Sequence, residues 1–278
     1  HTILQGDVRS QLATINDNSI RCCVTSPPYF GLRDYGMDEQ IGLERDPDAF
    51  VDTLVGVFRE VRRVLTPDGT LWVNIGDSYA GSGKGPEGNI GKGETHRNVG
   101  PTHGGIIPDG MKPKDLIGIP WMLAFALRKD GWYLRQDIIW HKTTCMPESV
   151  KDRCTKNHEY LFLLSKSRSY YFNAEAIKTP AKHSGLTKSY TTANKRSVWT
   201  IAPSNYKGAH FATFPAALVE PCILAGSAPG DIVLDPFLGS GTTLAVAKQH
   251  GRHGVGVELN PEYVTLAQQR IGAMPVSV

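Results

Sequence analysis

The sequence predicts an α/β fold with a mostly parallel sheet, and two stretches of the chain carry that prediction. In the first, an apolar strand at 20–24 is followed by a helix-periodic segment, 50–65, and by a second apolar strand, 70–75. In the second, a strand, a glycine turn, a helix and another strand follow one another within 231–258. Strands joined through helices in this way lie parallel in one sheet that the helices cover.

The remaining elements follow from periodicity and from turn residues. The chain opens with a strand that ends at Gly6-Asp7, and a short helix follows it. Further on we expect helices at 120–129, 214–226, 244–250 and 262–271, and strands at 132–140 and 161–164. These two strands should pair antiparallel at an edge of the sheet.

The composition is typical of a soluble globular protein. The chain has 278 residues, of which 40% are hydrophobic and 21% charged, enough for one large domain or a domain with an insertion. No apolar run reaches the roughly 20 residues that cross a bilayer, and no signal peptide is visible. We therefore expect no membrane partner and a cytoplasmic location. The five cysteines have no C-x-x-C spacing, which indicates reduced thiols rather than disulfides or a metal site.

A Gly-rich stretch with almost no large apolar residues predicts a mobile insertion over 80–115. Within it, 83–88 matches G-x-G-x-x-G, but no apolar helix follows. Neither Lys84 nor Lys92 is followed by Ser or Thr. The stretch therefore fails the context tests for a dinucleotide site and for a P-loop.

Positive charge is concentrated in one part of the chain. Between His141 and Gly208 there are 12 Lys or Arg and four Asp or Glu, a formal charge of +8. Since the whole chain carries +3, the remainder carries −5. A basic segment within an acidic body indicates a polyanionic partner, most simply nucleic acid. A merely well-solvated surface is the alternative.

The turn Ser26-Pro27-Pro28-Tyr29 follows the strand at 20–24 and forms a rigid corner rich in acceptors. The two prolines fix the backbone and have no N–H, so the turn presents carbonyl oxygens and the Ser26 hydroxyl. A flat ring with an exocyclic amine suits such a corner. Its amine would donate to Ser26 Oγ and the Pro27 carbonyl while Tyr29 stacks on the ring. A proline turn with a packing tyrosine is the structural alternative.

The stretch from Asp235 to Glu258 has the pattern of a nucleoside-cofactor site. A strand ends at Asp235, the turn contains Gly239-x-Gly241, and the next strand ends at Glu258, 23 positions after Asp235. Glycines let the backbone approach a ligand, and an acidic residue about 20 positions on typically binds ribose hydroxyls. Because no third glycine follows at the dinucleotide spacing, a cofactor with an amino acid end and a sulfonium charge fits better.

These two motifs resemble those of the S-adenosylmethionine-dependent DNA amino-methyltransferases. The S-P-P-Y turn precedes the glycine turn, which is the order of the beta group of that family, and the resemblance covers nearly the whole chain. It implies a mostly parallel seven-stranded sheet with helices on both faces and one antiparallel strand. It also divides the chain into a catalytic half (1–164), a target-recognition segment (165–209) and a cofactor-binding half (210–278).

The same resemblance implies which residues form the site. Ser26, Pro27, Pro28 and Tyr29 would be catalytic. The cofactor, S-adenosylmethionine, would be bound by Asp7, Asp235, Phe237, Gly239, Ser240, Gly241, Thr242, Thr243 and Glu258. Asp7 and Thr243 have structural alternatives, as a turn residue and a helix cap. We expect Lys142, Lys195 and Arg196 to contact DNA, and no metal.

The resemblance predicts methylation of the exocyclic N4 amine of a flipped-out cytosine in double-stranded DNA, because Ser at the first motif position is commoner among cytosine-N4 relatives. Adenine N6 is the alternative, and RNA or protein amides are remote ones. Pro221-Cys222 leaves cytosine C5 chemistry open, and the basic segment alone would suit a non-enzymatic DNA-binding protein. A homodimer and a cognate restriction endonuclease are further possible partners, in a bacterial or phage-encoded system.

Overall fold

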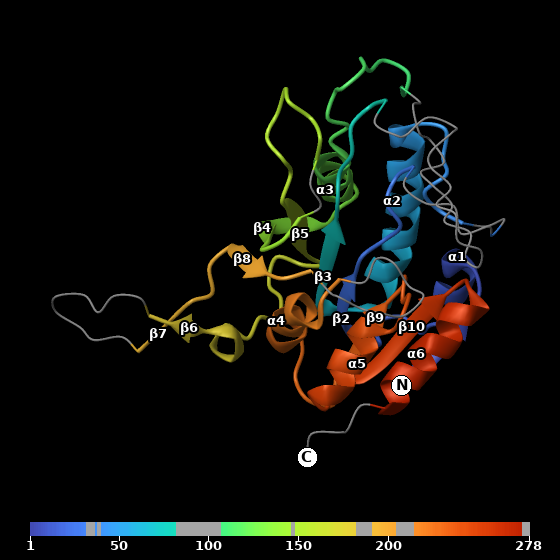
Figure 1. Cartoon of the computed structure of the whole chain (residues 1–278). Helices are drawn as coiled ribbons and strands as arrows, with labels where there is room; N and C mark the ends of the chain where they lie inside the picture. The colour runs from blue at the N-terminus through green and yellow to red at the C-terminus, as the bar shows by residue number, and fades with distance from the viewer. Residues whose placement is uncertain are drawn as a thin grey trace.

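A computed structural model describes residues 1–31, 37, 40–81, 107–145, 148–181, 191–203 and 214–273. Its main feature is an eight-stranded sheet in the order β1-β10-β9-β2-β3-β5-β4-β8 (Figure 1). The strands are β1 (Thr2–Gln5), β2 (Ile20–Thr25), β3 (Leu65–Ile75), β4 (Tyr133–Lys142), β5 (His158–Ser165), β8 (Val198–Ile201), β9 (Ile232–Asp235) and β10 (His253–Glu258). A separate small ladder joins β6 (Thr179–Pro180) to β7 (Thr192–Ala193).

The sheet is mostly parallel, as predicted. β1, β10, β9, β2 and β3 run parallel to their neighbours, β5 is antiparallel to both β3 and β4, and β8 is parallel to β4. The antiparallel pairing of β4 with β5 is also confirmed. The number of strands differs from the expected seven because β8, inside the predicted recognition segment, adds to β4 at the edge of the sheet.

Helices cover both faces of the sheet (Figure 1). Side chains of α1 (Val8–Leu12), α2 (Pro47–Val64) and α3 (Ile119–Lys129) pack with Cys23, Leu71 and Val73 into one core cluster. On the other face, α4 (Ala216–Gly226) and α5 (Thr242–Gln249) pack against Cys22 and Trp72, and α6 (Pro261–Ala273) packs on α5. Alternate residues of β2 and β3 thus enter opposite cores, as the period of two requires.

The start of α2 shows how the sequence sets an element. The Asp46 side chain accepts a hydrogen bond from Ala49 N at 2.8 Å, and Pro47 occupies the first turn, so the helix begins with a cap and a preset backbone angle. The helix ends directly at β3, which begins at Leu65, earlier than the start at residue 70 that the sequence predicts. A register shift between Ile20 and Cys22 accommodates that irregular start.

The structure describes only parts of two predicted segments, the Gly-rich insertion and the recognition segment. Most of the expected Gly-rich insertion, 82–106, lies outside the described residues. The predicted recognition segment includes a short 3-10 helix, η1 (Glu175–Ile177), besides β6, β7 and β8. Among the described residues, no helix is both long enough and apolar enough to span a membrane.

Candidate active site

The strand directions bring both predicted motifs to one edge of the sheet. The parallel strands β2, β3, β9 and β10 end at this edge with β4, and the antiparallel β5 begins there. The carboxyl ends of parallel strands are where α/β proteins bind ligands. The S-P-P-Y turn follows β2 and the glycine turn follows β9, and these two strands are neighbours in the sheet. Sequence positions more than 200 apart therefore meet at one site.

The Tyr29 hydroxyl, in the turn after β2, belongs to a polar network with residues of three strands, β3, β4 and β5. It donates to Glu159 Oε2 at 2.7 Å, and the same carboxylate oxygen accepts a hydrogen bond from Asn74 Nδ2 at 3.2 Å. The other oxygen of Glu159 pairs with Lys142 Nζ at 2.5 Å. Asn74 also donates to the Tyr160 carbonyl oxygen at 3.1 Å. These contacts hold the phenol end of Tyr29 in one place.

Gly76 lies against the ring of Tyr29. A Cβ atom at position 76 would lie 2.6 Å from Cε2 and 3.1 Å from Cδ2 of that ring. Real Cβ atoms do not approach other heavy atoms so closely, so only glycine lets the ring lie there. Hydrogen bonds at the hydroxyl and contact with Gly76 at the ring together set the orientation of Tyr29.

The Tyr29 phenol remains protonated. Burial of the side chain raises its pKa well above the ordinary value of 10.0, and the charge and hydrogen bond of Glu159 raise it further. A group that holds its proton this firmly is no general base. Tyr29 therefore contributes a ring surface and a fixed hydroxyl.

Asp235 is fully buried at the end of β9 and connects three elements. Its Oδ1 accepts hydrogen bonds from Thr25 Oγ1 at 2.7 Å and Phe237 N at 3.1 Å, and its Oδ2 lies 2.7 Å from Thr243 Oγ1. Burial raises its pKa to about 6, against the three hydrogen bonds, which lower it. The carboxyl group thus joins the S-P-P-Y strand to the glycine turn and to α5.

Glu258 and the glycine turn lie together at the end of β10. Its Oε2 accepts from Gly239 N at 2.8 Å and its Oε1 from Asn260 N at 2.8 Å, and burial raises its pKa. Gly239 has φ 52° and Gly241 has φ 82°, both in the left-handed region. A Cβ at Gly241 would also lie 2.9 Å from Cβ of Ala267. The turn is therefore tightly folded between Glu258 and α6.

The hydroxyls of the glycine turn are engaged within the protein. Arg270 Nη1 of α6 donates to Ser240 Oγ at 3.0 Å and Thr242 Oγ1 at 2.8 Å, and all three turn hydroxyl residues are buried. Thr243 Oγ1 contacts the Val24 carbonyl oxygen at 3.2 Å as well as Asp235. The side chains of Ser240, Thr242 and Thr243 thus hold the turn in its conformation. Phe237 is partly buried against the core on the side of α1–α3.

Asp7 lies beside this site and caps α1. It follows β1, whose Gln5 pairs with Glu258, and Gly6 N donates to the Glu258 carbonyl oxygen at 2.9 Å. The Asp7 carboxylate accepts from Arg9 N at 3.1 Å and pairs with the Arg9 guanidinium at 2.9 Å. Burial raises the pKa of Asp7, but the Arg9 guanidinium and the backbone hydrogen bonds together lower it below its ordinary value.

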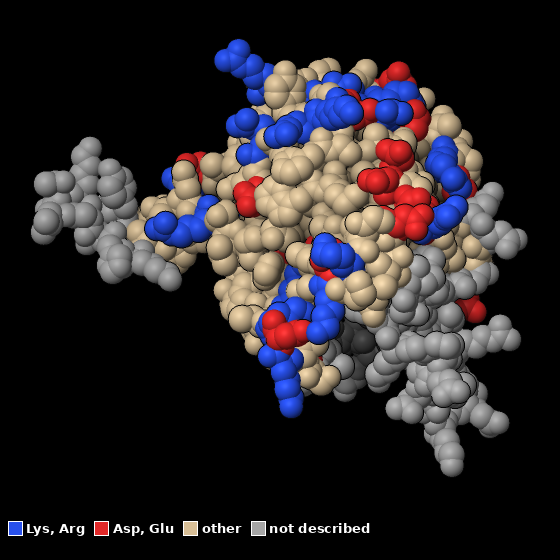
Figure 2. Space-filling view, turned by 90° about the horizontal axis from the view of Figure 1, so that it is seen from above, with Lys and Arg blue, Asp and Glu red and all other residues tan. Residues whose placement is uncertain are grey.

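The three predicted DNA-contacting residues have different surroundings. Lys142 is paired with Glu159, and its Nζ lies 4.7 Å from the centre of the Trp140 ring. Lys195 lies in the same way over Trp199, whereas Arg196 is exposed. Figure 2 shows Lys and Arg side chains in several groups on the upper face, with acidic side chains beside some of them. Of the three residues, Arg196 has the side chain most available to a partner.

Cys222 is a buried core residue. It lies inside α4 with no exposed surface, and its thiol donates to the Leu218 carbonyl oxygen at 3.2 Å. Burial raises its pKa well above 9.0. Because a nucleophilic cysteine must be an accessible thiolate, this position does not support cytosine C5 chemistry.

Sequence reasoning missed Glu159, Asn74, Gly76 and Arg270. Glu159 and Asn74 are polar residues close to apolar runs of β5 and β3, and Gly76 directly follows a buried strand. These features are visible in the sequence and could have indicated the three residues. Arg270 had no such signal, because only the packing of α6 on α5 places it at the turn.

The arrangement defines an α/β enzyme with a nucleoside-cofactor turn next to an aromatic, acceptor-rich corner. The family model described as DNA methylase, of the N6/N4 type, matches residues 20–269. The Type II methyltransferase M.Cfr9I of Citrobacter freundii is 53% identical over 271 residues, which cover 97% of this chain and 87% of that protein. M.SmaI of Serratia marcescens is 51% identical over 97% of this chain and 90% of its own. The chain belongs to the N6/N4 DNA methylase family.

Solved structures share the fold. The Thermus thermophilus protein TTHA0409, solved with S-adenosyl-L-methionine, has a TM-score of 0.67 and 29% identity, covering 99% of this chain and 95% of its own. The PvuII DNA methyltransferase, described as cytosine-N4-specific, has a TM-score of 0.69 and 21% identity over 96% of this chain and 85% of its own. At that identity the PvuII enzyme is evidence for the fold alone.

Proposed function

We propose that this enzyme transfers the methyl group of S-adenosylmethionine to the exocyclic N4 amine of a cytosine flipped out of double-stranded DNA. The observation that carries the proposal is the S-P-P-Y turn at the end of β2, beside the glycine turn at the end of β9. Thr25, the residue before Ser26, is hydrogen-bonded to Asp235 at the base of that glycine turn. The acceptor corner and the cofactor turn are therefore fixed to each other.

The acceptor corner addresses the weak point of the reaction. An exocyclic amine is a poor nucleophile because its lone pair is delocalised into the ring. Hydrogen bonds from its two N–H groups to Ser26 Oγ and the Pro27 carbonyl oxygen favour a pyramidal nitrogen whose lone pair points out of the ring plane. Positioning of this kind supplies most of the rate in a direct displacement.

Tyr29 supplies the surface on which the flipped base stacks. A base outside the duplex needs such a platform, and a rigid one loses less entropy when the base binds. The Glu159 hydrogen bond and the contact with Gly76 hold the Tyr29 ring before the base arrives. The residues that hold the ring thus form part of the proposed mechanism.

The cofactor would lie along the glycine turn, where the residues present suit it. The Glu258 carboxylate would accept from ribose hydroxyls, and the backbone at Phe237 and Gly239 would face the rest of the nucleoside. When bound, S-adenosylmethionine supplies a methyl group activated by the sulfonium charge. Asp235, Ser240, Thr242 and Thr243 would act indirectly, since their side chains are hydrogen-bonded within the protein.

Recognition of the DNA site is proposed for the segment 165–209, in which Arg196 is one of the exposed cations. Lys142 and Lys195 would act more through the positioning of Glu159 and Trp199 than through phosphate contacts. We also propose a homodimer and a cognate restriction endonuclease as partners of the enzyme.

The product nucleoside tests the choice of atom. DNA methylated by the enzyme would be digested to nucleosides and separated against standards for N4-methylcytosine, 5-methylcytosine and N6-methyladenine. Separation is needed because the two methylcytosines have the same mass. N4-methylcytosine is the expected product. N6-methyladenine without N4-methylcytosine would overturn the base assignment and leave the amino-methyltransferase family intact.

A further inference from the structure

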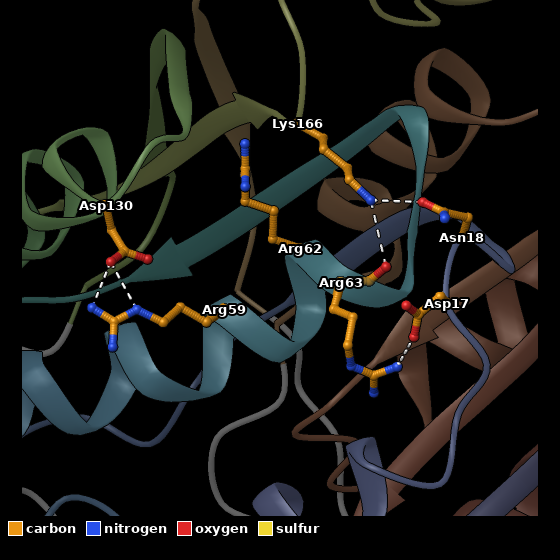
Figure 3. Close-up of a pocket in the computed structure, with 7 residues that line it drawn as sticks. All are labelled: Asp17, Asn18, Arg59, Arg62, Arg63, Asp130 and Lys166. Atoms are coloured by element: carbon orange, nitrogen blue, oxygen red, sulfur yellow. Dashed lines mark hydrogen bonds and ion pairs between the residues drawn. The ribbon is translucent and has the colours of Figure 1, made fainter.

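The edge of the sheet opposite the active site has a pocket lined by four cations. Its volume is about 480 Å³, and its lining residues are Asp17, Asn18, Arg59, Arg62, Arg63, Asp130 and Lys166 (Figure 3). They come from the α1–β2 loop, the last turns of α2, the end of α3 and the residue after β5. Because α2 ends where β3 begins, this pocket lies at the starts of the parallel strands, remote from the S-P-P-Y turn.

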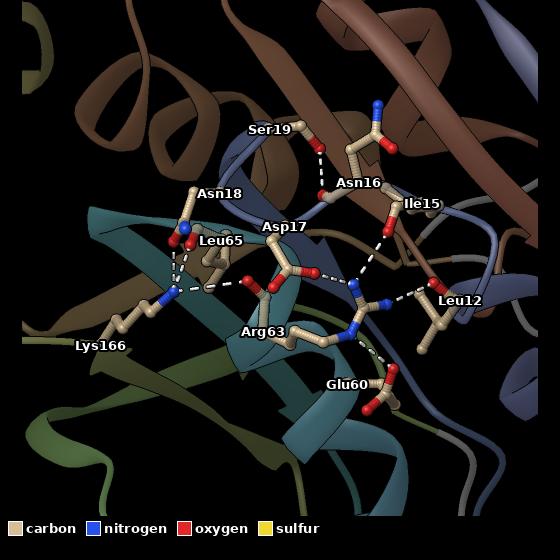
Figure 4. A network of polar contacts seen from close by, with 10 residues as sticks. All are labelled: Leu12, Ile15, Asn16, Asp17, Asn18, Ser19, Glu60, Arg63, Leu65 and Lys166. Atoms are coloured by element: carbon tan, nitrogen blue, oxygen red, sulfur yellow. Dashed lines mark hydrogen bonds and ion pairs between the residues drawn. The ribbon is translucent and has the colours of Figure 1, made fainter.

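Two of the four cations already have carboxylate partners. Arg59 pairs with Asp130 at 2.6 Å. Arg63 pairs with Asp17 and, at 2.8 Å, with Glu60, and it donates to the Leu12 and Ile15 carbonyl oxygens (Figure 4). Both carboxylates that line the pocket are thus engaged with these arginines, which hold α3 and the α1–β2 loop to α2.

The other two cations have no carboxylate partner among the described residues. Lys166 Nζ contacts only neutral oxygens: Asn18 Oδ1 at 2.8 Å, the Leu65 carbonyl at 2.5 Å and the Arg63 carbonyl at 3.4 Å. Arg62 and Lys166 line the same pocket. Burial and then the positive charge of Arg62 lower the pKa of Lys166, whereas the charge of Asp17 raises it. Arg62 Nε is buried and has no hydrogen-bond acceptor within the part of the chain that the structure describes.

Such a pair is incomplete without an anion. Two neighbouring positive groups repel each other, and a buried N–H without an acceptor loses its hydration without replacement. Figure 3 shows the Arg62 side chain rising from α2 between Asp130 and Lys166, into the space that the pocket residues surround. A tetrahedral oxyanion offers several acceptor atoms to a guanidinium, and its charge also balances a nearby ammonium whose three N–H groups already have acceptors.

We propose that this pocket binds a phosphate group, which accepts hydrogen bonds from the Arg62 guanidinium and balances the nearby charge of Lys166. The group is either free inorganic phosphate or a phosphate of a DNA strand other than the one held at the active site. This inference does not depend on which base the enzyme methylates.

Isothermal titration with inorganic phosphate, against chloride at equal ionic strength, tests the site in the full chain. The variants are Arg62→Gln and, as a control with the same change of charge, Arg128→Gln, whose side chain lies over Phe125 outside the pocket. We expect wild type and Arg128→Gln to bind phosphate alike, and Arg62→Gln to bind at least about tenfold more weakly. Phosphate NMR linewidths give a second readout, and circular dichroism checks that each variant is folded.

Competition distinguishes the two sources of phosphate. If a short duplex without a methylation site displaces phosphate, and does so less well in Arg62→Gln, the ligand is a DNA phosphate. If the duplex does not compete, the ligand is free phosphate. The proposal is overturned if wild type shows no binding beyond chloride, or if Arg62→Gln binds phosphate as tightly as Arg128→Gln.

Discussion

At the scale of single residues, Tyr29 depends on partners that are distant in sequence. Its ring rests against Gly76 and its hydroxyl is bound by Glu159, 130 positions away. Neither partner carries out chemistry on a base. Both decide where the platform for the base lies, so their substitution should affect the rate more than the affinity for the cofactor.

Gly76→Ala should displace the Tyr29 ring. The added Cβ would lie 2.6 Å from the ring, which must move. We expect kcat to fall at least about tenfold, since misplacement by an ångström is costly in catalysis. Gly56→Ala is the matched control: nothing lies within 4 Å of a Cβ there, and in α2 the change should stabilise the fold by about 0.5–1 kcal/mol. Equal activity of both variants would count against a positioning role for Gly76.

Glu159→Gln removes the negative charge of the carboxylate that accepts the hydrogen bond of the Tyr29 hydroxyl and pairs with Lys142. A hydrogen bond to a charged group contributes about 1.5–3 kcal/mol, so kcat should fall about tenfold or more while the Kd for S-adenosylmethionine stays unchanged. The test is a double-mutant cycle with Tyr29→Phe. If Glu159 acts through the hydroxyl, its substitution has a smaller effect in the Tyr29→Phe background. Additive losses would indicate that Glu159 acts some other way.

At the scale of elements, Asp235 connects β9, β2 and α5, and its protonation fits the geometry. Thr243 Oγ1 has one hydrogen for two acceptors, the Val24 carbonyl and Asp235 Oδ2. When Asp235 is protonated it can donate to Thr243, which then donates to Val24. All contacts of the junction are then made, in agreement with the pKa raised by burial to about 6.

Stability should therefore depend on pH through Asp235. Its folded pKa of about 6 exceeds the ordinary 3.8, so its contribution is fully present below pH 3.8 and is lost as pH rises through 6. The shift corresponds to about 3 kcal/mol. Asp235→Asn mimics the protonated form at every pH. In urea titrations, the stability of wild type relative to Asp235→Asn should fall by most of this amount between pH 4 and 7; a constant difference would contradict the assignment.

The elements also show what the sequence could predict. Strand–helix–strand units, helix caps and the two motifs depend on local sequence patterns. The predicted helices and most of the predicted strands therefore agree with the structure. β8 escaped prediction because its four residues, of which only Trp199 is buried, become a strand only by pairing with β4. Arg270 likewise gains its role only through the packing of α6, which no local pattern encodes.

At the scale of the whole molecule, the two edges of the sheet have different chemistry. The carboxyl ends of the parallel strands bring together Ser26, Tyr29, Glu159, Asp235 and Glu258. The opposite edge has the arginine pairs of α2 and the cation pair Arg62–Lys166. The +8 segment also spans both edges, since it includes Lys142 at one and Lys166 at the other. The distribution of charge along the sequence therefore does not indicate which edge of the sheet binds a polyanion.

At the active site, we infer that the S-P-P-Y corner acts on an amine next to the cofactor turn. The most direct test is the single-turnover rate of methyl transfer by Ser26→Ala, with S-adenosylmethionine and DNA both saturating. Loss of a hydrogen bond that strengthens in the transition state predicts a rate about 10- to 100-fold lower, with the Kd for S-adenosylmethionine unchanged. A single-turnover rate equal to that of wild type would contradict this role of the corner.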